Sequence, residues 1–463
     1  GRGSRCPRRR RAGVSFADDR PPAGVSRREA IALLLLLLFA AWLRIGAVLG
    51  TEVIEPIRGD ALDYYHYAHN LRESGAYSRT PATGVAGEVP PADAFRRPGY
   101  ALFILPWIAH PPTVGMLLRI GLLQAALGVA LVGLAWWLGR RLVGRGTGWA
   151  VGGLCAISPH LVNSAIWLLS EPLFALLVLL ALVLAFDGRA AIAGGARLYA
   201  AALAFGAAML TRPTLDYLPW LLVPLALLAL PRPRAWRTVA VLALGIATVM
   251  GPWWARNLVQ FGQLDDRSLA VNTLLHGMYP DFLWEDRPET LAMPYKFDPE
   301  APAIGRSTAT VLSALAERAS ADPARYLRWY LVGKPLSLVA WDEVRIGDAF
   351  ILSVSATPYF SHPVFLATHL LARLLHWPLM VLALAGCVLA WRRRSPVVGA
   401  AQAAGLRVVS LLLLYILAVH VAGAPYPRYS VPFRPELYLM ACYAAAEAWA
   451  WLRGRAARDK VAA

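Results

Sequence analysis

Residues 31–50 read IALLLLLLFAAWLRIGAVLG, an apolar stretch that contains six consecutive leucines. A helix of about 20 apolar residues is long enough to cross the hydrocarbon core of a bilayer. A cleaved signal peptide is the alternative interpretation, but many further apolar stretches follow, which favours a retained signal-anchor. We expect about ten membrane-spanning helices; the further stretches lie near residues 115–138, 148–166, 170–187, 196–211, 215–230, 237–254, 365–391, 406–422 and 432–452.

The composition indicates the same class of protein. Hydrophobic residues make up 57% of the 463 residues and charged residues only 16%, whereas soluble domains have about 45–50% and about 25%. This composition excludes a disordered chain, a small disulfide-linked scaffold and an ordinary soluble enzyme. The net charge of +17 is also typical of nucleic-acid binding, but positive charge on the cytoplasmic side of a membrane protein explains it better. We therefore expect no nucleic-acid partner.

The distribution of charge predicts the topology. We place a basic, disordered arm, residues 1–28, in the cytoplasm. The short loops on that side and the basic tail, residues 453–463, are then rich in arginine, as the positive-inside rule requires. Of the 29 acidic residues, 23 fall on the opposite side. The transmembrane domain then covers residues 29–452 and has two long outer loops, 51–114 and 255–364; long loops of this kind usually carry function.

The first outer loop contains a candidate for proton transfer. Leu62, Tyr65, Ala68 and Leu71 recur at helical spacing, which predicts an interfacial helix that begins at Asp60. A carboxylate at a helix N-terminus is stabilised in its ionised form and is able to accept a proton. The alternative interpretation is that Asp60 only caps the helix.

Five arginines on the outer side are candidates for anion binding. Arg96 and Arg97 precede an apolar segment, residues 99–109, that is too short to span and that we expect in the membrane interface. Two guanidinium groups at headgroup depth suit a phosphate, although snorkelling to lipid headgroups is the alternative. Arg212, Arg256 and Arg428 also stand on the side where positive charge is disfavoured, and the same two interpretations apply to them.

Three further features are expected to have local roles. Glu171 follows Ser170 at the outer start of a predicted span, where an acid that faces a cavity is a functional candidate and a helix-capping role is the alternative. His66 and His69 have a spacing that can hold a metal, but we find no third ligand and favour an interfacial role. Asp322 before Pro323 predicts the start of another helix.

Five motifs occur in chain order, and together they resemble a known family. They are Gly59-Asp60 with Tyr64 and Ala68, Arg97-Pro98-Gly99-Tyr100, Ser170-Glu171-Pro172, Pro252-Trp253-Trp254-Ala255-Arg256-Asn257, and Arg428-Tyr429. The set resembles GT-C glycosyltransferases, and within them the bacterial relatives of the protein O-mannosyltransferases and of the lipid A aminoarabinose transferase. The resemblance covers residues 30–450.

The resemblance implies an all-α polytopic membrane enzyme with a GT-C-like bundle and interfacial helices in its two outer loops. It implies transfer of a hexose or pentose from a polyprenyl-phosphate carrier to a cell-envelope acceptor, whether lipid, polysaccharide or protein. The enzyme is expected in the plasma (inner) membrane, with both termini cytoplasmic and the active site on the outer face. The resemblance permits a divalent metal, but the residues do not require one, and we predict no metal ligands and no other cofactor.

The resemblance also assigns expected roles to single residues. Asp60 matches the first-loop aspartate that acts as general base, which implies inversion at the sugar, and Glu171 matches a second acidic position. The residues expected to bind the substrate are Tyr64, Arg96, Arg97, Arg256, Arg428 and Tyr429.

Two other functions compete with the transferase. A polyprenyl-linked sugar flippase or other transporter needs polar groups at mid-membrane, whereas the span centres here are mostly Ala, Leu, Val and Gly. A structural subunit of an envelope complex would have no need for Asp60.

Overall fold

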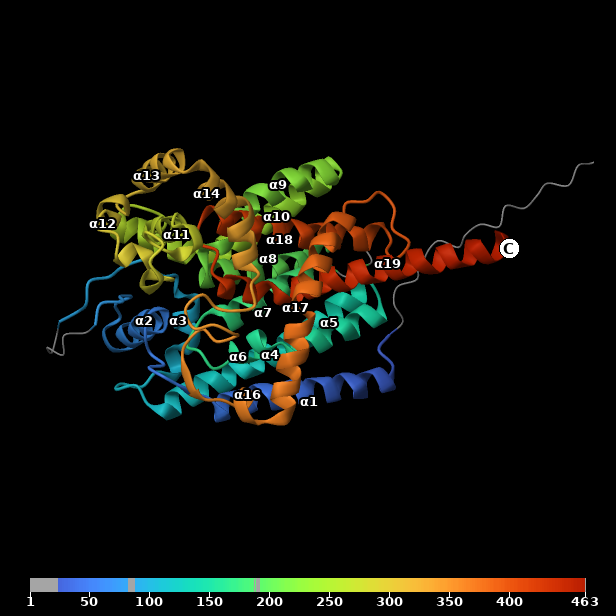
Figure 1. The fold of residues 1–463 in the computed structure, drawn as a ribbon, viewed down its shortest axis with the longest axis horizontal. Helices are drawn as coiled ribbons and strands as arrows, with labels where there is room; N and C mark the ends of the chain where they lie inside the picture. The colour runs from blue at the N-terminus through green and yellow to red at the C-terminus, as the bar shows by residue number, and fades with distance from the viewer. Residues whose placement is uncertain (1–23, 82–87, 187, 189–191, 463) are drawn as a thin grey trace, which may run out of the picture.

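The computed structural model describes residues 24–81, 88–186, 188 and 192–462, and it is mostly helical. Long helices run beside one another, and short helices cover one end of them (Figure 1). The start of α1 (Arg27–Gly50) and the end of α19 (Arg434–Ala462) lie at the opposite end. Most of the predicted N-terminal arm, residues 1–23, falls outside the described residues. Helix α1 begins at Arg27, and the domain boundary at residue 28 stays a prediction.

Five helices within the described ranges are long and apolar enough to cross a membrane: α1, α4 (Val114–Leu142), α10 (Arg232–Phe261), α17 (Pro363–Leu389) and α18 (Ala400–Ala422). Helices also form at the other predicted positions: α5 (Arg145–Ile157), α7 (Glu171–Ala185), α8 (Gly195–Thr211), α9 (Leu218–Ala229) and α19. Four of these have only 12 to 17 residues. The count of about ten spans therefore stays a prediction.

One predicted span is not continuous. The stretch 148–166 is interrupted after α5, because Pro159 lacks the backbone N–H that would continue the helix and instead begins the short helix α6 (Pro159–Asn163). The chain then passes through turns to Ser170, where α7 starts.

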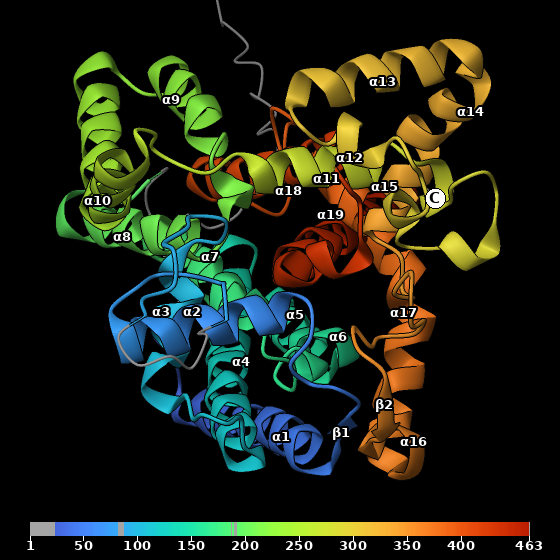
Figure 2. The same cartoon turned by 90° about the vertical axis from the view of Figure 1, so that its left-hand side faces the viewer.

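The two outer loops form the layer of short elements, as Figure 2 shows in a view onto this layer. The first loop contains β1 (Glu52–Val53), α2 (Asp60–Ser74), α3 (Pro98–Ile104) and η1 (Leu105–Trp107). The second contains α11 (Ser268–Gly277), η3 (Pro280–Phe282), η4 (Pro288–Thr290), η5 (Pro294–Lys296), α12 (Ala301–Ile304), α13 (Thr308–Ala321), α14 (Pro323–Arg328), the π-helical turn η6 (Trp329–Gly333), α15 (Lys334–Leu338), β2 (Val354–Ala356) and α16 (Pro358–Ser361). Two 3₁₀ segments, η2 (Pro213–Leu215) and η7 (Pro427–Phe433), precede α9 and α19.

A short sheet joins the two loops. Strand β1 pairs antiparallel with β2, with Glu52 opposite Ala356. The all-α prediction missed this sheet, which has only two short strands. The pairing ties the end of α1 to the segment that leads into α17.

Helix α2 confirms the helix predicted to begin at Asp60. Gly59 has a φ of 55°, a conformation that glycine adopts without strain, and it turns the chain into the helix. Gly59 is also the N-cap, so Asp60 is the first helical residue and not the cap. The face that carries Tyr64, Tyr65 and Ala68 is buried in the protein core. Similarly, Asp322 caps α14 as predicted and accepts from the Arg325 N–H at 3.1 Å.

A buried glutamine fixes the first loop against the bundle. Gln124 in α4 donates to the carbonyl oxygens of Ala165 at 3.0 Å and Trp167 at 2.8 Å. Its own oxygen accepts from the Tyr100 hydroxyl at 2.7 Å. Because Tyr100 also packs edge-on against Tyr64 at 4.8 Å, the segment before α7, helix α3 and helix α2 are held together.

Candidate active site

Asp60 lies between two arginines that come from distant parts of the chain. Arg96 Nη2 donates to Asp60 Oδ1 at 2.7 Å, and Arg428 Nη2 donates to Asp60 Oδ2 at 2.5 Å. Arg96 precedes α3 and Arg428 lies in η7, so three segments meet at one carboxylate. Asp60 is therefore neither an isolated surface acid nor a simple cap.

Arg96 also binds the next turn of α2. Its Nε donates to Asp63 Oδ2 at 2.7 Å, and its guanidinium lies 5.2 Å from the centre of the Tyr64 ring. The side chain is only 12% exposed. Arg96 is thus oriented by two carboxylates and an aromatic face.

The arginines decide the charge state of Asp60. Burial favours the neutral carboxyl, but the positive charges of Arg428 and Arg96 outweigh burial and hold the pKa of Asp60 well below its usual range. Asp60 is therefore ionised at neutral pH. While both arginines remain paired with it, Asp60 is also a weak base.

Glu171 belongs to an adjacent cluster. It is the first residue of α7 and is 2% exposed, and Arg212 Nη1 lies 2.8 Å from its Oε1. Ser170 does not cap the helix; its hydroxyl accepts from the Tyr64 hydroxyl at 3.1 Å and from Arg212 at 3.3 Å. Tyr64 thus connects the α2 helix that carries Asp60 to the start of α7.

Tyr429 contacts an arginine of each cluster. The guanidinium carbons of Arg428 and Arg212 lie 5.2 Å and 5.5 Å from its ring centre. The negative face of the ring therefore stabilises both positive charges. The predicted residues Asp60, Tyr64, Arg96, Glu171, Arg428 and Tyr429 are thus brought together in one region.

Arg97, which was expected to bind the substrate, does not lie beside Asp60. Its guanidinium donates to both carboxylate oxygens of Asp216, each at 2.6 Å, and its Nε donates to Asp265 at 3.1 Å. It also donates to the Met209 carbonyl at 2.9 Å, and the residue is 5% exposed. Among the described contacts, Arg97 has none with Asp60; its neighbour Arg96 holds that position.

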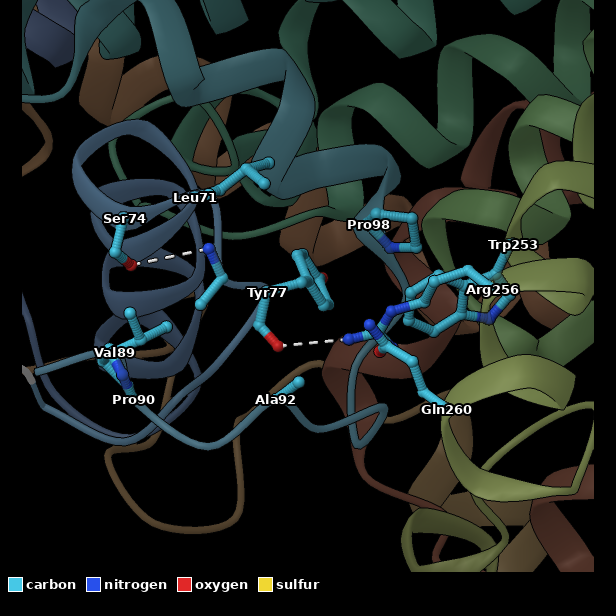
Figure 3. A pocket seen from close by; sticks show the side chains of 12 residues that line it. Leu71, Ser74, Tyr77, Val89, Pro90, Ala92, Pro98, Trp253, Arg256 and Gln260 are labelled. Carbon is cyan, nitrogen blue, oxygen red and sulfur yellow. Dashed lines mark hydrogen bonds between the residues drawn. The ribbon is translucent and has the colours of Figure 1, made fainter.

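Arg256 lies at the edge of a cavity of about 540 Å³. Figure 3 shows its guanidinium directed at the Tyr77 carbonyl oxygen, 3.4 Å away, and it also donates to the Asp93 carbonyl at 2.9 Å. The lining is mixed apolar, aromatic and polar: Leu71, Ser74, Gly75, Ala76, Tyr77, Val89, Pro90, Ala92, Pro98, Trp253, Arg256 and Gln260. Because the Tyr77 hydroxyl donates to the Arg96 carbonyl at 3.1 Å, the cavity adjoins the segment that carries Arg96.

Two residues of the second outer loop were not singled out by the motifs. His276 in α11 stacks on Tyr295 at 4.0 Å, and burial, with nearby Arg428, lowers its pKa to about 4 despite the opposing charge of Asp60. Glu343 is 7% exposed and lies near Arg428 and Glu171. The sequence contains a weak indication that His276 is a site residue, because it is a polar residue in an apolar helix. It contains no such indication for Glu343, which is one of many acids in its loop.

The carboxylates of this site are paired with arginines in the arrangement seen here. Among the residues that the structure describes, no three His, Cys, Asp or Glu side chains are grouped so that they could hold a metal ion. Asp60, Asp63 and Glu171 each have a guanidinium partner instead. The guanidinium groups of the site are donors of the kind that bind anionic ligands.

Comparison with known proteins gives a match at the level of fold. No family model matches the sequence, and no curated protein matches it. The fold is similar to that of AglB, the oligosaccharyltransferase of Archaeoglobus fulgidus. With the complex of AglB, an inhibitory peptide and a dolichol-phosphate, the TM-score is 0.50 at 13% identity over 94% of this chain and 52% of AglB. With apo AglB the TM-score is 0.51 at the same identity and coverage. ArnT from Cupriavidus metallidurans bound to undecaprenyl phosphate gives 0.37 at 15% identity, over 90% of this chain and 77% of ArnT.

AglB and ArnT are both GT-C glycosyltransferases. This chain spans about half the length of AglB, 52%. The likeness to AglB confirms the GT-C-like fold that the motifs predicted.

Proposed function

We propose that this protein is a membrane glycosyltransferase that moves a sugar from a polyprenyl-phosphate carrier to a cell-envelope acceptor. The observation that carries the proposal is the carboxylate of Asp60 held between Arg96 and Arg428. A base and two phosphate-binding groups are what such a transfer needs. The AglB fold supports the proposal, and one AglB structure contains a dolichol-phosphate, a carrier of this chemical class.

The two arginines are assigned to the phosphate of the donor. A phosphate is an alternative anionic partner for a guanidinium group, with suitable bidentate geometry. When Arg96 and Arg428 turn to the donor phosphate, the charges that depress the pKa of Asp60 are partly neutralised. Donor binding therefore raises the basicity of Asp60 and frees its oxygens for the acceptor.

The reaction is then a single displacement. The acceptor hydroxyl gives its proton to Asp60 while its oxygen attacks the anomeric carbon from the face opposite the phosphate, which inverts that centre. The bond from the anomeric carbon to the phosphate oxygen breaks, and Arg96 and Arg428 stabilise the negative charge left on the phosphate. Glu171, fixed by Arg212, orients the acceptor, and Tyr64 and Tyr429 shape the space between them.

The other two arginines have supporting roles in the proposal. Arg97 does not reach Asp60; its ion pairs with Asp216 and Asp265 hold the segment on which Arg96 sits. Arg256, at the cavity edge, is assigned to the carrier phosphate or its neighbouring lipid chain.

The proposal places the site on the outer face of the plasma membrane, with both termini in the cytoplasm. The arginine-rich loops support this orientation. It also agrees with the arrangement in Figure 1, where α2 and α3 lie opposite the start of α1 and the end of α19.

Turnover by purified wild type and Asp60→Asn tests the proposal. Both are given a panel of polyprenyl-phosphate sugars and envelope acceptors, and released polyprenyl phosphate is measured by mass spectrometry. Glu73→Gln is the matched control, because Glu73 is an exposed acid near the other end of the same helix α2. We expect release by wild type and Glu73→Gln and none above background by folded Asp60→Asn. Equal release by all three would remove Asp60 as the base, and lipid-sugar movement across proteoliposomes without release would favour a transporter.

A further inference from the structure

Glu343 is a buried acid in the second outer loop that the proposed reaction does not yet use. It lies between α15 and β2, is 7% exposed, and its Oε1 has no hydrogen-bond partner among the described residues. Buried carboxyl oxygens without a partner are uncommon, because leaving one unpaired costs free energy. An acid kept in such a position calls for a ligand or a chemical role.

The loop that carries Glu343 is held firmly. The Glu343 N–H donates to the Asp348 carbonyl at 2.9 Å, and the Gly347 N–H donates to the Glu343 carbonyl at 2.8 Å. Two residues earlier, the Trp341 carbonyl lies 2.8 Å from His160 Nε2, and the Trp341 indole packs edge-on against His160 and His376. The position of Glu343 is therefore set by the backbone of a tight turn and by an aromatic anchor.

This turn lies against the segment that carries Arg428. Val344, next in the chain, packs in a cluster with Tyr426, two residues before Arg428. Arg434 Nη2 donates to the Ala340 carbonyl at 3.3 Å from the start of α19. Glu343 is thus close to the Arg428 side of the Asp60 site.

The charged and titratable groups around Glu343 come from three elements and from the residue that precedes one of them. They are Arg428 on η7, Tyr426 directly before η7, Glu171 on α7 and Arg434 on α19. Burial, helped by the negative charge of Glu171, raises the pKa of Glu343 to about 8 against the opposing charges of Arg428 and Arg434. Glu343 therefore carries a proton at neutral pH and is able to donate a hydrogen bond.

We propose that Glu343, as a neutral carboxylic acid, donates a hydrogen bond to the departing phosphate oxygen beside Arg428. This inference rests on the proposed transferase function and adds a third group to the leaving-group site. The bond from the acceptor oxygen to the anomeric carbon forms, and the bond from that carbon to the phosphate oxygen breaks. The electron pair stays on the phosphate oxygen, the hydroxyl proton goes to Asp60, and Glu343 keeps its proton in the hydrogen bond.

Two substitutions at Glu343 test whether its role is to donate a hydrogen bond or to carry a negative charge. Glu343→Gln keeps a hydrogen-bond donor of similar size, whereas Glu343→Leu keeps the volume and removes the donor. Glu289→Gln is the matched control, because Glu289 is an exposed acid of the same outer loop. The measurement is kcat and KM for polyprenyl phosphate release between pH 6 and 9, with the melting temperature of each variant in detergent.

We expect Glu343→Gln to keep kcat within about threefold of wild type and Glu343→Leu to lose about tenfold to a hundredfold, with little change in KM. Wild-type kcat/KM should fall as the pH rises through about 8, where Glu343 of the donor-free enzyme loses its proton, and Glu343→Gln should lack this alkaline fall. Glu289→Gln should follow the wild type throughout.

Three outcomes would overturn the inference. They are wild-type kcat in Glu343→Leu, a loss in Glu343→Gln as large as in Glu343→Leu, and an alkaline fall that persists in Glu343→Gln. If Glu343→Leu does not fold, the pH profile of Glu343→Gln still decides. A wild type that releases no polyprenyl phosphate from any donor would refute the transferase itself, whereas an active wild type with unaffected variants would refute only the role of Glu343.

Discussion

Arg428 Nη2 lies 2.5 Å from Asp60 Oδ2, although 368 positions separate the two residues in the chain. The contact joins the first outer loop to the segment before the last helix. It places a permanent positive charge against the proposed base. The activity of the site should therefore depend on Arg428 as well as on Asp60.

Replacement of Arg428 tests this dependence. We expect Arg428→Gln to lower kcat/KM by about 10²–10³-fold, because one group that stabilises the departing phosphate is lost. Arg428→Lys keeps the charge but lacks the planar fork, so it should recover part of the loss. Steady-state release of polyprenyl phosphate measures both. Wild-type kcat/KM in folded Arg428→Gln would exclude Arg428 from the phosphate site.

Arg96 and Arg97 are adjacent in the chain, but we expect Arg96 to be needed for activity and Arg97 for stability. Arg97→Met leaves Asp216 and Asp265, which are 27% and 26% exposed, without their shared partner. Breaking such a pair should cost about 3 kcal/mol and lower the melting temperature in detergent. Arg96→Met should instead abolish turnover with a smaller effect on melting. The reverse pattern would show that Arg97 is the residue at the phosphate.

His276 should make the fold sensitive to mild acid. Its folded pKa of about 4 is below the value of about 6.5 expected when unfolded. Between these values the unfolded chain binds more protons, so the stability from His276 is present above pH 6.5 and is lost as the pH falls towards 4. The melting temperature of wild type should therefore fall between pH 7 and pH 5, and His276→Gln should show a smaller fall. Parallel curves for the two proteins would contradict this assignment.

Arg256 should affect the binding of the donor more than its reaction. Its guanidinium lines the 540 Å³ cavity and does not contact Asp60 in the described structure. We expect Arg256→Ala to raise the KM for the donor about tenfold, which corresponds to about 1.4 kcal/mol, with kcat reduced less. Gln260→Ala, on the same helix and in the same cavity, is the control for a change of shape without loss of charge. A lower kcat with an unchanged KM would instead place Arg256 at the reacting atoms.

The local sequence pattern was sufficient to predict some parts of this structure. The helix that begins at Asp60 follows from the spacing of its apolar residues and from Gly59, and the start of α14 follows from Asp322 and Pro323. These features depend on neighbouring residues only. The candidate site was assembled from motifs whose order, and not their individual strength, made the resemblance specific.

Other parts depend on contacts that no local pattern contains. Arg96 and Arg97 are adjacent and chemically identical, and only the folded chain shows that the first binds Asp60 and the second binds Asp216. The pairing of Glu52 with Ala356 joins segments too short to be predicted as strands. Glu343 is distinguished from the other acids of its loop by burial without a partner for its Oε1 among the described residues. The buried Asp298 of the same loop is instead paired with Tyr279 and Arg318.

The ion pairs also determine the net charge of the site. Three carboxylates, those of Asp60, Asp63 and Glu171, face three guanidinium groups, those of Arg96, Arg212 and Arg428. The site without donor is therefore electrically neutral. A sugar phosphodiester would bring one negative charge, and the phosphate monoester that remains after transfer would carry about 1.5 to 2 at pH 7. Because the acceptor proton has moved to Asp60, the site itself then carries one positive charge, which balances the charge gained by the phosphate. Once Asp60 loses this proton to water, the site is neutral again and binds the more highly charged carrier less tightly, which favours release of the spent carrier into the membrane.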